Sequence, residues 1–298
     1  MPGPTPERPP VRLLRAPYDS GHRDVRMGAG PTALSRAGAA SRLRSRGHAV
    51  REELVAPASD WQAELATAFE LQRLVAAAVA DARAAGEVPL LLAGNCNTTL
   101  GVLAGMRADH RRVGLVWLDA HGDFNTPEED TSGFLDGQGL AMMVGRCWRA
   151  LAGDVPGFQP LPERDVVLVG ARDLSEAQVA VLERSALTWL RPEQVRRPAD
   201  LAGALDGLAR RVDAVHFHVD LDVHDPSIAP ANGYAAPDGL TAEEVLGVLL
   251  ATAARLPVVS ATLASYDPAY DIEDRMRTTA LALLEQVAAV AVVSGRRA

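Results

Sequence analysis

The segment VGLVWLDAHGDFN, residues 113–125, joins a short apolar run to a cluster of polar residues. The run Val113–Leu118 is apolar on successive positions, which is typical of a strand buried on both faces of a parallel sheet. Alternate residues of an extended chain point the same way, so Asp119, His121 and Asp123 can face one site. Because ligands bind beyond the carboxyl ends of parallel strands, the segment predicts an α/β sheet and the edge that carries its site.

A second segment repeats this arrangement. The apolar run Ala214–Val219 leads into DLDVHDP, where Asp220 and Asp222 can face one site. An isolated Asp-x-Asp is more often a turn, but two carboxylate motifs that each end an apolar strand favour a site. Carboxylates and an imidazole at one sheet edge would repel strongly without a cation, and a divalent ion or a pair of ions neutralises them. Such mixed ligands suit Mn²⁺ better than a structural zinc ion.

The remaining chain alternates short apolar runs with amphipathic stretches, which predicts a single three-layer αβα domain over residues 11–298 with a mostly parallel sheet. The proline-rich residues 1–10 are expected to be disordered. Further strands are expected at Val11–Ala16, Val88–Leu92, Asp165–Val169 and Pro257–Ala264. Helices are expected at Trp61–Ala85, Thr98–Arg107, Gly137–Leu151, Ser175–Arg184, Ala199–Val212 and Ala242–Arg255.

Composition narrows the class of protein. The net charge of −8 over 298 residues argues against a nucleic-acid binder. The two cysteines, Cys96 and Cys147, are too few for a disulfide scaffold and fit a reducing cytosol, so a cytoplasmic location is expected. No apolar stretch is long enough for a membrane span. The chain has no lysine, which excludes mechanisms that need a lysine Schiff base or a P-loop lysine.

The carboxylate motifs resemble those of the ureohydrolase family, which comprises arginases, agmatinases, formimidoylglutamases and their relatives. DAHGDFN at 119–125 is similar to the family's Asp-Ala-His-x-Asp-x-Asn, and HVDLDVHDPSIAPANGYAAPDGL at 218–240 is similar to Ser-x-Asp-x-Asp-x-x-Asp-Pro with its Pro/Gly-rich loop. AGNCN at 93–97 stands where the family has Gly-Gly-Asp-His-Ser, and SGHRDVRMGAGPTAL at 20–34 and VGARDL at 169–174 also match. In motif detail the chain looks similar to the Nω-hydroxy-L-arginine amidinohydrolase branch.

The resemblance implies an arginase-like fold, a small-molecule substrate, a homo-oligomer (trimer or hexamer) and two divalent ions, expected to be Mn²⁺. It implies that a metal-bridging hydroxide attacks a guanidinium-type carbon, with Asp123 accepting a proton. Asn125 and Asp173 match positions that contact the amino-acid end of the substrate in arginases. The implied ligands are Cys96, Asp119, Asp123 and Asp220 for one ion, and Asp119, His121, Asp220 and Asp222 for the other.

Three departures from the family pattern bear on the substrate. Cys96 replaces the ligand histidine, and as a softer thiolate ligand it would move the metal preference towards Zn²⁺, Fe²⁺ or Co²⁺; the alternative is a buried apolar cysteine. In the stretch from Ser132 to Asp136, the aspartate occupies the slot of the arginase proton-shuttle histidine. Ser265 stands where arginases place a glutamate that pairs with the guanidinium, so ordinary arginase activity is not expected.

The leading hypothesis is a binuclear metal-dependent hydrolase that cleaves a C–N bond of a guanidino, N-substituted guanidino or formimidoyl compound. Asp123 and Asp136 are its candidate catalytic residues, and Asn125, Asp173, Ser265 and Ser132 are its candidate substrate contacts. One alternative is a non-catalytic paralogue that acts as a metal-binding partner subunit; another is a family member redirected to an amide or cyclic substrate. Tyr234 could line the pocket mouth, although an aromatic residue is more often part of the core.

Overall fold

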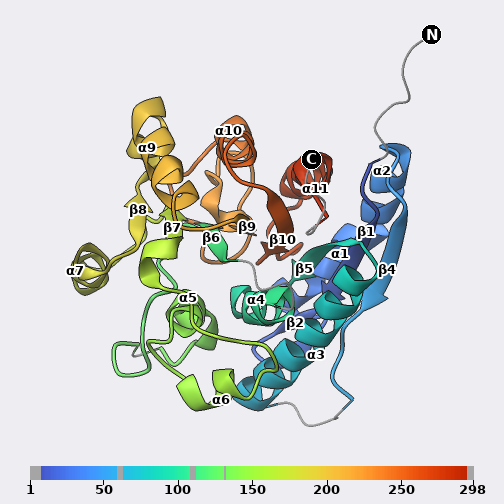
Figure 1. Ribbon diagram of the computed structural model, residues 1–298, viewed down its shortest axis with the longest axis horizontal. Helices are drawn as coiled ribbons and strands as arrows, with labels where there is room; N and C mark the ends of the chain where they lie inside the picture. The colour runs from blue at the N-terminus through green and yellow to red at the C-terminus, as the bar shows by residue number, and fades with distance from the viewer. Residues whose placement is uncertain (1–7, 59–62, 108–111, 131, 294–298) are drawn as a thin grey trace.

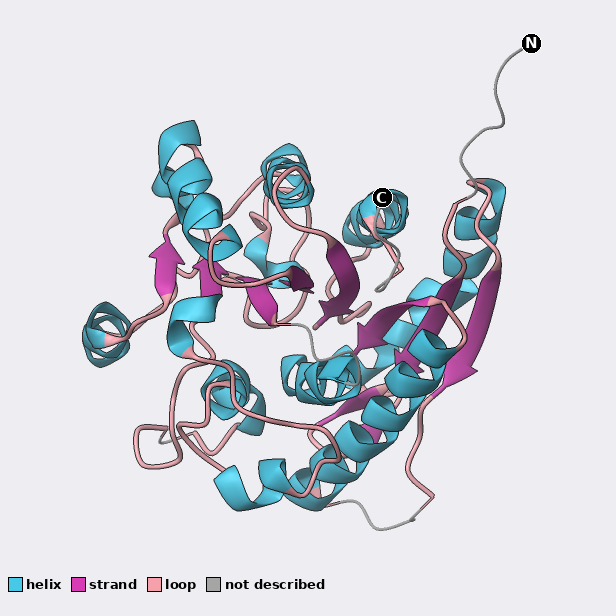
Figure 2. Cartoon of the chain, viewed as in Figure 1, coloured by secondary structure: helices cyan, strands magenta, loops and turns pink. Residues whose placement is uncertain are grey.

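A single eight-stranded sheet lies at the centre of the computed structural model, which describes residues 8–58, 63–107, 112–130 and 132–293. The strand order is β4-β1-β5-β10-β9-β6-β7-β8, and every neighbouring pair is parallel (Figures 1 and 2). The predicted α/β class is therefore confirmed. The strands are β1 (Val11–Ala16), β4 (Val50–Leu54), β5 (Val88–Ala93), β6 (Val113–Leu118), β7 (Val166–Val169), β8 (Thr188–Leu190), β9 (Ala214–Asp220) and β10 (Val258–Ala264).

Helices cover both faces of the sheet, which gives three layers (Figure 1). One face packs against α1 (Gly30–Arg36), α2 (Ala39–Ser45), α9 (Pro198–Ala209), α10 (Ala242–Ala253) and α11 (Arg275–Val290). The other packs against α3 (Glu64–Ala84), α4 (Thr99–Met106), α5 (Gly139–Met143), α6 (Arg149–Gly153) and α7 (Glu176–Arg184). A short α8 (Pro192–Val195) and a hairpin of β2 (Tyr18–Asp19) and β3 (His22–Arg23) complete the named helices and strands. Among the described helices, none is both long and apolar enough to cross a membrane.

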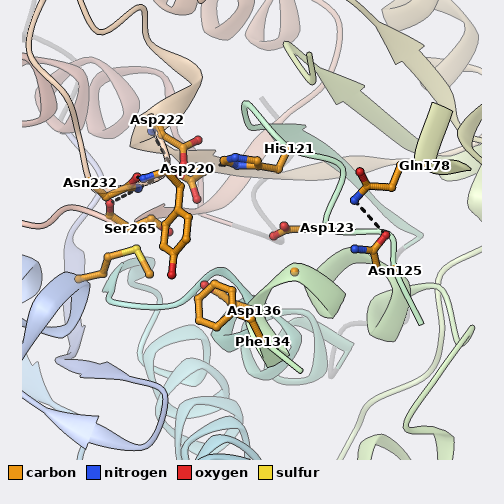
Figure 3. Close-up of a pocket in the computed structure, with 13 residues that line it drawn as sticks. His121, Asp123, Asn125, Phe134, Asp136, Gln178, Asp220, Asp222, Asn232 and Ser265 are labelled. Atoms are coloured by element: carbon orange, nitrogen blue, oxygen red, sulfur yellow. Dashed lines mark hydrogen bonds and ion pairs between the residues drawn. The ribbon is translucent and has the colours of Figure 1, made fainter. Parts of the chain in front are cut away.

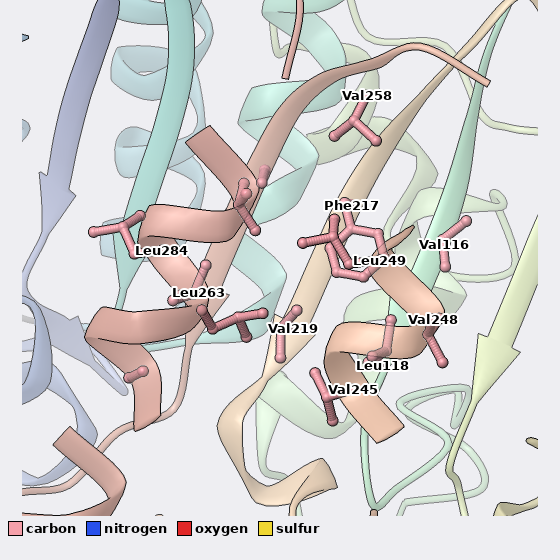
Figure 4. Packing of buried hydrophobic residues seen from close by; sticks show 14 of the residues in the cluster. Val116, Leu118, Phe217, Val219, Val245, Val248, Leu249, Val258, Leu263 and Leu284 are labelled. Carbon is pink, nitrogen blue, oxygen red and sulfur yellow. The ribbon is translucent and has the colours of Figure 1, made fainter. Parts of the chain in front are cut away.

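The core explains why the central strands are apolar on successive residues. Phe217 and Val219 of β9 pack with Val248 and Leu249 of α10 on one side of the sheet (Figure 4). The alternate residue His218 faces the other side, where its ring meets Thr99 of α4. Burial on both faces thus removes the polar alternation that a half-exposed strand would show.

One predicted helix differs from the structure, and two other predictions fall partly outside the described residues. The helix expected over Gly137–Leu151 is wrong: the chain forms a 3-10 turn, then α5, then α6, because Gly145 and Trp148 adopt positive φ angles of 78° and 51° between the helices. The helix expected from Trp61 begins at Glu64 in the described residues, which exclude 59–62. Residues 1–7 of the predicted disordered segment also lie outside the described residues.

Candidate metal centre and active site

Four neighbouring central strands deliver the candidate site residues to one edge of the sheet. In the order β5-β10-β9-β6, Cys96 follows β5, Ser265 follows β10, Asp220 ends β9, and Asp119 follows β6. All are carboxyl ends of parallel strands, where the sequence predicts the site. Residues distant in the sequence therefore converge because their strands are neighbours in the sheet.

Two groups of ligand-type side chains meet there and share Asp119. Ligand atoms of Cys96, Asp119 and Asp220 lie within 4.8 Å of one another, and so do those of Asp119, His121 and Asp222. Cys96 Sγ lies 3.0 Å from Asp220 Oδ2. His121 Nδ1 lies 3.3 Å from Asp119 Oδ1 and 3.5 Å from Asp222 Oδ2. The structure thus brings five of the six predicted metal ligands into two adjacent groups.

The electrostatics of these groups fit a cation. Burial, reinforced by the nearby Asp222 carboxylate, raises the pKa of Asp119 and that of Asp220. Although burial opposes its charged form, the carboxylates of Asp222 and Asp119 raise the pKa of His121 to about 10. Burial and the Asp220 carboxylate raise the pKa of the Cys96 thiol, so the thiolate form requires a positive partner. Buried carboxylates at this spacing repel one another, and divalent ions at the two groups would remove that penalty.

Asp123 approaches the centre from a loop and Asp136 from the 3-10 helix Leu135–Gln138. Asp123 has a φ of 47° and lines the cavity, but its carboxylate belongs to neither ligand group. Asp136 accepts hydrogen bonds from the backbone N–H of Cys96 at 2.9 Å and that of Asn97 at 2.7 Å. The side-chain amide of Asn95 also donates a hydrogen bond to Asp136, at 2.9 Å. These hydrogen bonds lower the pKa of Asp136, but burial outweighs them and raises that pKa to about 7. Asp136 therefore holds the turn that carries Cys96.

A cavity of about 150 Å³ opens over the two ligand groups (Figure 3). Asn125 lies on one wall and accepts a hydrogen bond from Gln178 Nε2 at 3.1 Å. Ser265 lies on the opposite side, with Oγ 3.3 Å from Cys96 Sγ and a φ of 64°. The lining residues are Met27, His121, Asp123, Asn125, Phe134, Asp136, Gly137, Gln178, Asp220, Asp222, Asn232, Tyr234 and Ser265.

Two predicted substrate contacts lie outside this lining. The Asp173 side chain is 64% exposed, with Oδ2 3.7 Å from His121 Nε2. Ser132 is exposed, and its hydroxyl donates to Asp130 at 2.6 Å. The structure brings neither residue into the cavity, so substrate contact by Asp173 or Ser132 stays a prediction.

Arg172 and Asn232 position the loop after β9, and sequence reasoning singled out neither. Arg172 donates to backbone carbonyls on both sides of that loop: to Pro237 at 2.7 Å, to Ala236 at 2.6 Å and to Asp222 at 3.2 Å. Asn232 Nδ2 donates to the Ser265 carbonyl at 2.8 Å and to Asp222 Oδ2 at 3.2 Å. Arg172 lies in the VGARDL motif and Asn232 in the Pro/Gly-rich loop. The sequence does not reveal their hydrogen-bond partners, because these are brought near only by the tertiary fold.

An aromatic pair forms the mouth of the cavity. Tyr234 stacks on Phe134 with ring centroids 5.5 Å apart, and its ring lies nearly perpendicular to that of His121 with centroids 6.5 Å apart. Tyr234 is 51% exposed, so the core placement favoured from the sequence is wrong. Its position at the mouth makes it available to a bound substrate.

Comparison with known proteins agrees with this architecture. The family model described as "Arginase family" matches residues 10–290. An arginase of Bacillus caldovelox is 29% identical over 289 residues, covering 92% of this chain and 96% of that protein. An N(omega)-hydroxy-L-arginine amidinohydrolase of Streptomyces lavendulae is 28% identical over 243 residues, covering 82% and 84%. The crystal structure of Bacillus subtilis arginase superposes with a TM-score of 0.82 at 26% identity, covering 97% of this chain and 99% of that one. The chain belongs to the arginase family.

Proposed function

We propose that this protein is a binuclear metal-dependent hydrolase that cleaves an amidino C–N bond. The observation that carries the proposal is the pair of ligand groups sharing Asp119 at the base of the cavity. When bound there, two divalent ions would supply the bridging hydroxide nucleophile and offset the charge that develops on the reacting carbon's substituents. Asp123, which faces the same cavity, is the candidate proton acceptor.

The donor set supports a mixed metal preference. Carboxylate and imidazole donors at the group of Asp119, His121 and Asp222 suit Mn²⁺. The thiol of Cys96 in the other group is softer, which favours Zn²⁺, Fe²⁺ or Co²⁺ there. We therefore expect the holoprotein to carry two divalent ions, both Mn²⁺. The group that contains Cys96 should accept softer ions more readily than the other group.

The walls of the cavity favour an N-substituted guanidine among the possible substrates. Ser265 offers a neutral hydroxyl, so this wall provides no carboxylate for the bidentate pair that an unmodified guanidinium favours. A hydroxyl or similar substituent on the terminal nitrogen could exchange a hydrogen bond with Ser265. The hydroxyarginine-cleaving relative from Streptomyces lavendulae is consistent with this choice. The uncharged Asn125–Gln178 pair lines the cavity wall opposite Ser265, which supports a contact between this pair and the far end of the substrate.

The test is turnover by the metal-reconstituted protein. Arginine, Nω-hydroxy-L-arginine, agmatine and formimidoylglutamate are each supplied, and urea, hydroxyurea or formamide is measured. We expect product from Nω-hydroxy-L-arginine in excess of arginine, and loss of that product in Asp222→Asn. Exposed Asp154, remote from the cavity lining, provides the matched control Asp154→Asn, which should keep full activity. Two bound ions without turnover of any amidine or guanidine would contradict the proposal.

Assembly and location remain predictions. A homo-oligomer, either a trimer or a hexamer, is expected, and light scattering coupled to size-exclusion chromatography measures its mass. The cytoplasmic location is inferred only from composition.

A further inference from the structure

Two amide side chains, Asn125 and Gln178, form the cavity wall opposite Ser265 (Figure 3). The start of α7 fixes the direction of the Gln178 amide. Ser175 is the N-cap of that helix, and its backbone N–H donates to Gln178 Oε1 at 2.7 Å. The Ser175 hydroxyl accepts from the backbone N–H of Gln178 at 3.3 Å, which completes a capping box. Because a backbone N–H can only donate, the atom that it meets on Gln178 must be the amide oxygen.

The capping box in turn fixes the direction of the Asn125 amide. With its oxygen engaged by Ser175, Gln178 reaches Asn125 through Nε2, which can only donate. The atom 3.1 Å away is therefore the Asn125 oxygen, and Asn125 Nδ2 is left on the cavity side, as Figure 3 shows. Among the described residues, none accepts a hydrogen bond from that nitrogen. The wall thus turns unpaired N–H groups to the cavity, while both amide oxygens already accept a hydrogen bond.

Unpaired N–H groups on this wall select an acceptor at the distal end of a substrate, which is the end remote from the reacting carbon. A carboxylate is the strongest acceptor of this kind, because a hydrogen bond to an ionised group is about twice as strong as one between neutral groups. An ammonium group carries only donors, so it would meet N–H groups where it needs an acceptor. The wall therefore separates guanidino compounds that end in a carboxylate from those that end in an ammonium group.

We propose that Gln178 is a positioning residue that holds the Asn125 NH₂ group towards the cavity, so that the protein selects amidino substrates with a distal carboxylate. The inference rests on the proposed function, because it concerns the substrate of the same cavity. Asn125 contacts the substrate, whereas Gln178 acts through the direction of the Asn125 amide. Gln178→Glu reverses that direction: a carboxylate still accepts from Ser175 and preserves the helix cap, but it cannot donate to the Asn125 oxygen.

The experiment compares two ligands that share a guanidino group and a four-carbon chain and differ only at the distal end. 5-Guanidinopentanoate ends in a carboxylate, and agmatine ends in an ammonium group. Affinity for the Mn²⁺-loaded full chain is measured as the dissociation constant, or as KM where the ligand turns over. We expect the wild type to bind 5-guanidinopentanoate about tenfold more tightly than agmatine. Gln178→Glu should reverse this order, and the uncharged Gln178→Met should reduce the preference because the Asn125 amide is then free to turn.

Two further variants separate the direction of the amide from the added charge. Gln194 accepts from the Arg191 N–H at 2.9 Å in the capping box of α8, outside the cavity lining, so Gln194→Glu is the matched control and should leave the preference unchanged. In an Asn125→Ala background there is no amide to turn, so Gln178→Glu should change the preference much less than it does in the wild type. An equal change in both backgrounds would show a direct effect of charge and overturn the positioning role.

The remaining outcomes distinguish this inference from the proposed function. Equal affinities of the wild type for the two ligands, or binding of neither, would overturn the inference, even if another guanidine releases urea or hydroxyurea. A preference for the carboxylate that is unchanged in Gln178→Met and in Asn125→Ala would overturn it as well. The predicted order of affinities without turnover of any guanidine would support the inference and contradict the proposed function alone.

Discussion

Replacing Arg172 by lysine tests how the loop after β9 is held. The guanidinium is a planar fork that reaches Pro237 and Ala236 on one side and Asp222 on the other. A lysine ammonium is a single point of charge and can keep about one of the two short contacts, at 2.7 and 2.6 Å. Each charge-assisted bond contributes about 1.5–3 kcal/mol. Because Arg172 is partly exposed and water replaces some of the loss, we expect Arg172→Lys to lower the free energy of unfolding by about 1–2 kcal/mol.

The assay is urea unfolding followed by circular dichroism, combined with titration of Mn²⁺ into the metal-free protein. Loosening the Asp222 backbone should also weaken ion binding, by about tenfold. Arg255 provides the matched control, because it donates to the Asp206 carboxylate and the Ala251 carbonyl on the surface. Arg255→Lys should change unfolding by less than about 0.5 kcal/mol. If Arg172→Lys unfolds and binds Mn²⁺ like Arg255→Lys, the clamp has no role and the reasoning is refuted.

Three further predictions concern the cavity. Burial raises the pKa of Asp136 to about 7, above its unfolded value, so the metal-free protein should lose stability as the pH rises from about 4 to 7. Urea unfolding of the metal-free protein across that range measures this loss, and saturating Mn²⁺ should abolish it. A stability that does not change with pH in the metal-free protein would contradict the prediction. Ser265→Gly should relieve the positive φ and stabilise the protein by at most about 1 kcal/mol, but it should lower turnover. The control Asp238→Gly, at a φ of 63°, should stabilise the protein without affecting turnover. Equal turnover in both variants would argue against a role for the Ser265 hydroxyl. Tyr234→Ala should raise KM about 2- to 10-fold through loss of the stack on Phe134, with little change in Tm, whereas Tyr234→Phe should leave KM unchanged. An unchanged KM in Tyr234→Ala would show that this ring does not contact the substrate.

The sequence predicts the central strands well because their burial on both faces leaves uninterrupted apolar runs. It does not predict β4, whose residues Val50–Leu54 are mostly exposed and charged, or β8, which is three residues long. Both are edge strands, and an edge strand lacks the two-sided burial that creates the signal. The sequence analysis also predicts no helix at α11, although its residues include an apolar stretch from Leu281 onwards.

The site was predictable to the extent that its ligands end strands. Asp119 and Asp220 follow from strand position and alternation alone. The role of Asp136 does not, because its slot in the motif suggests a proton shuttle, whereas its oxygens turn to the backbone amides of Cys96 and Asn97. His218 opens the motif at 218–240, but its contact with Cys96 joins residues 122 positions apart and arises only from the register of the sheet.

The central claim is a two-ion centre in which Cys96 is a ligand, and elemental analysis of the reconstituted, dialysed protein tests it most directly. We expect two divalent ions per chain in the wild type and one in each of Cys96→Ser and Asp222→Asn, with all three proteins folded by circular dichroism. Fewer than two ions in the wild type, or two ions retained in Cys96→Ser, would contradict it.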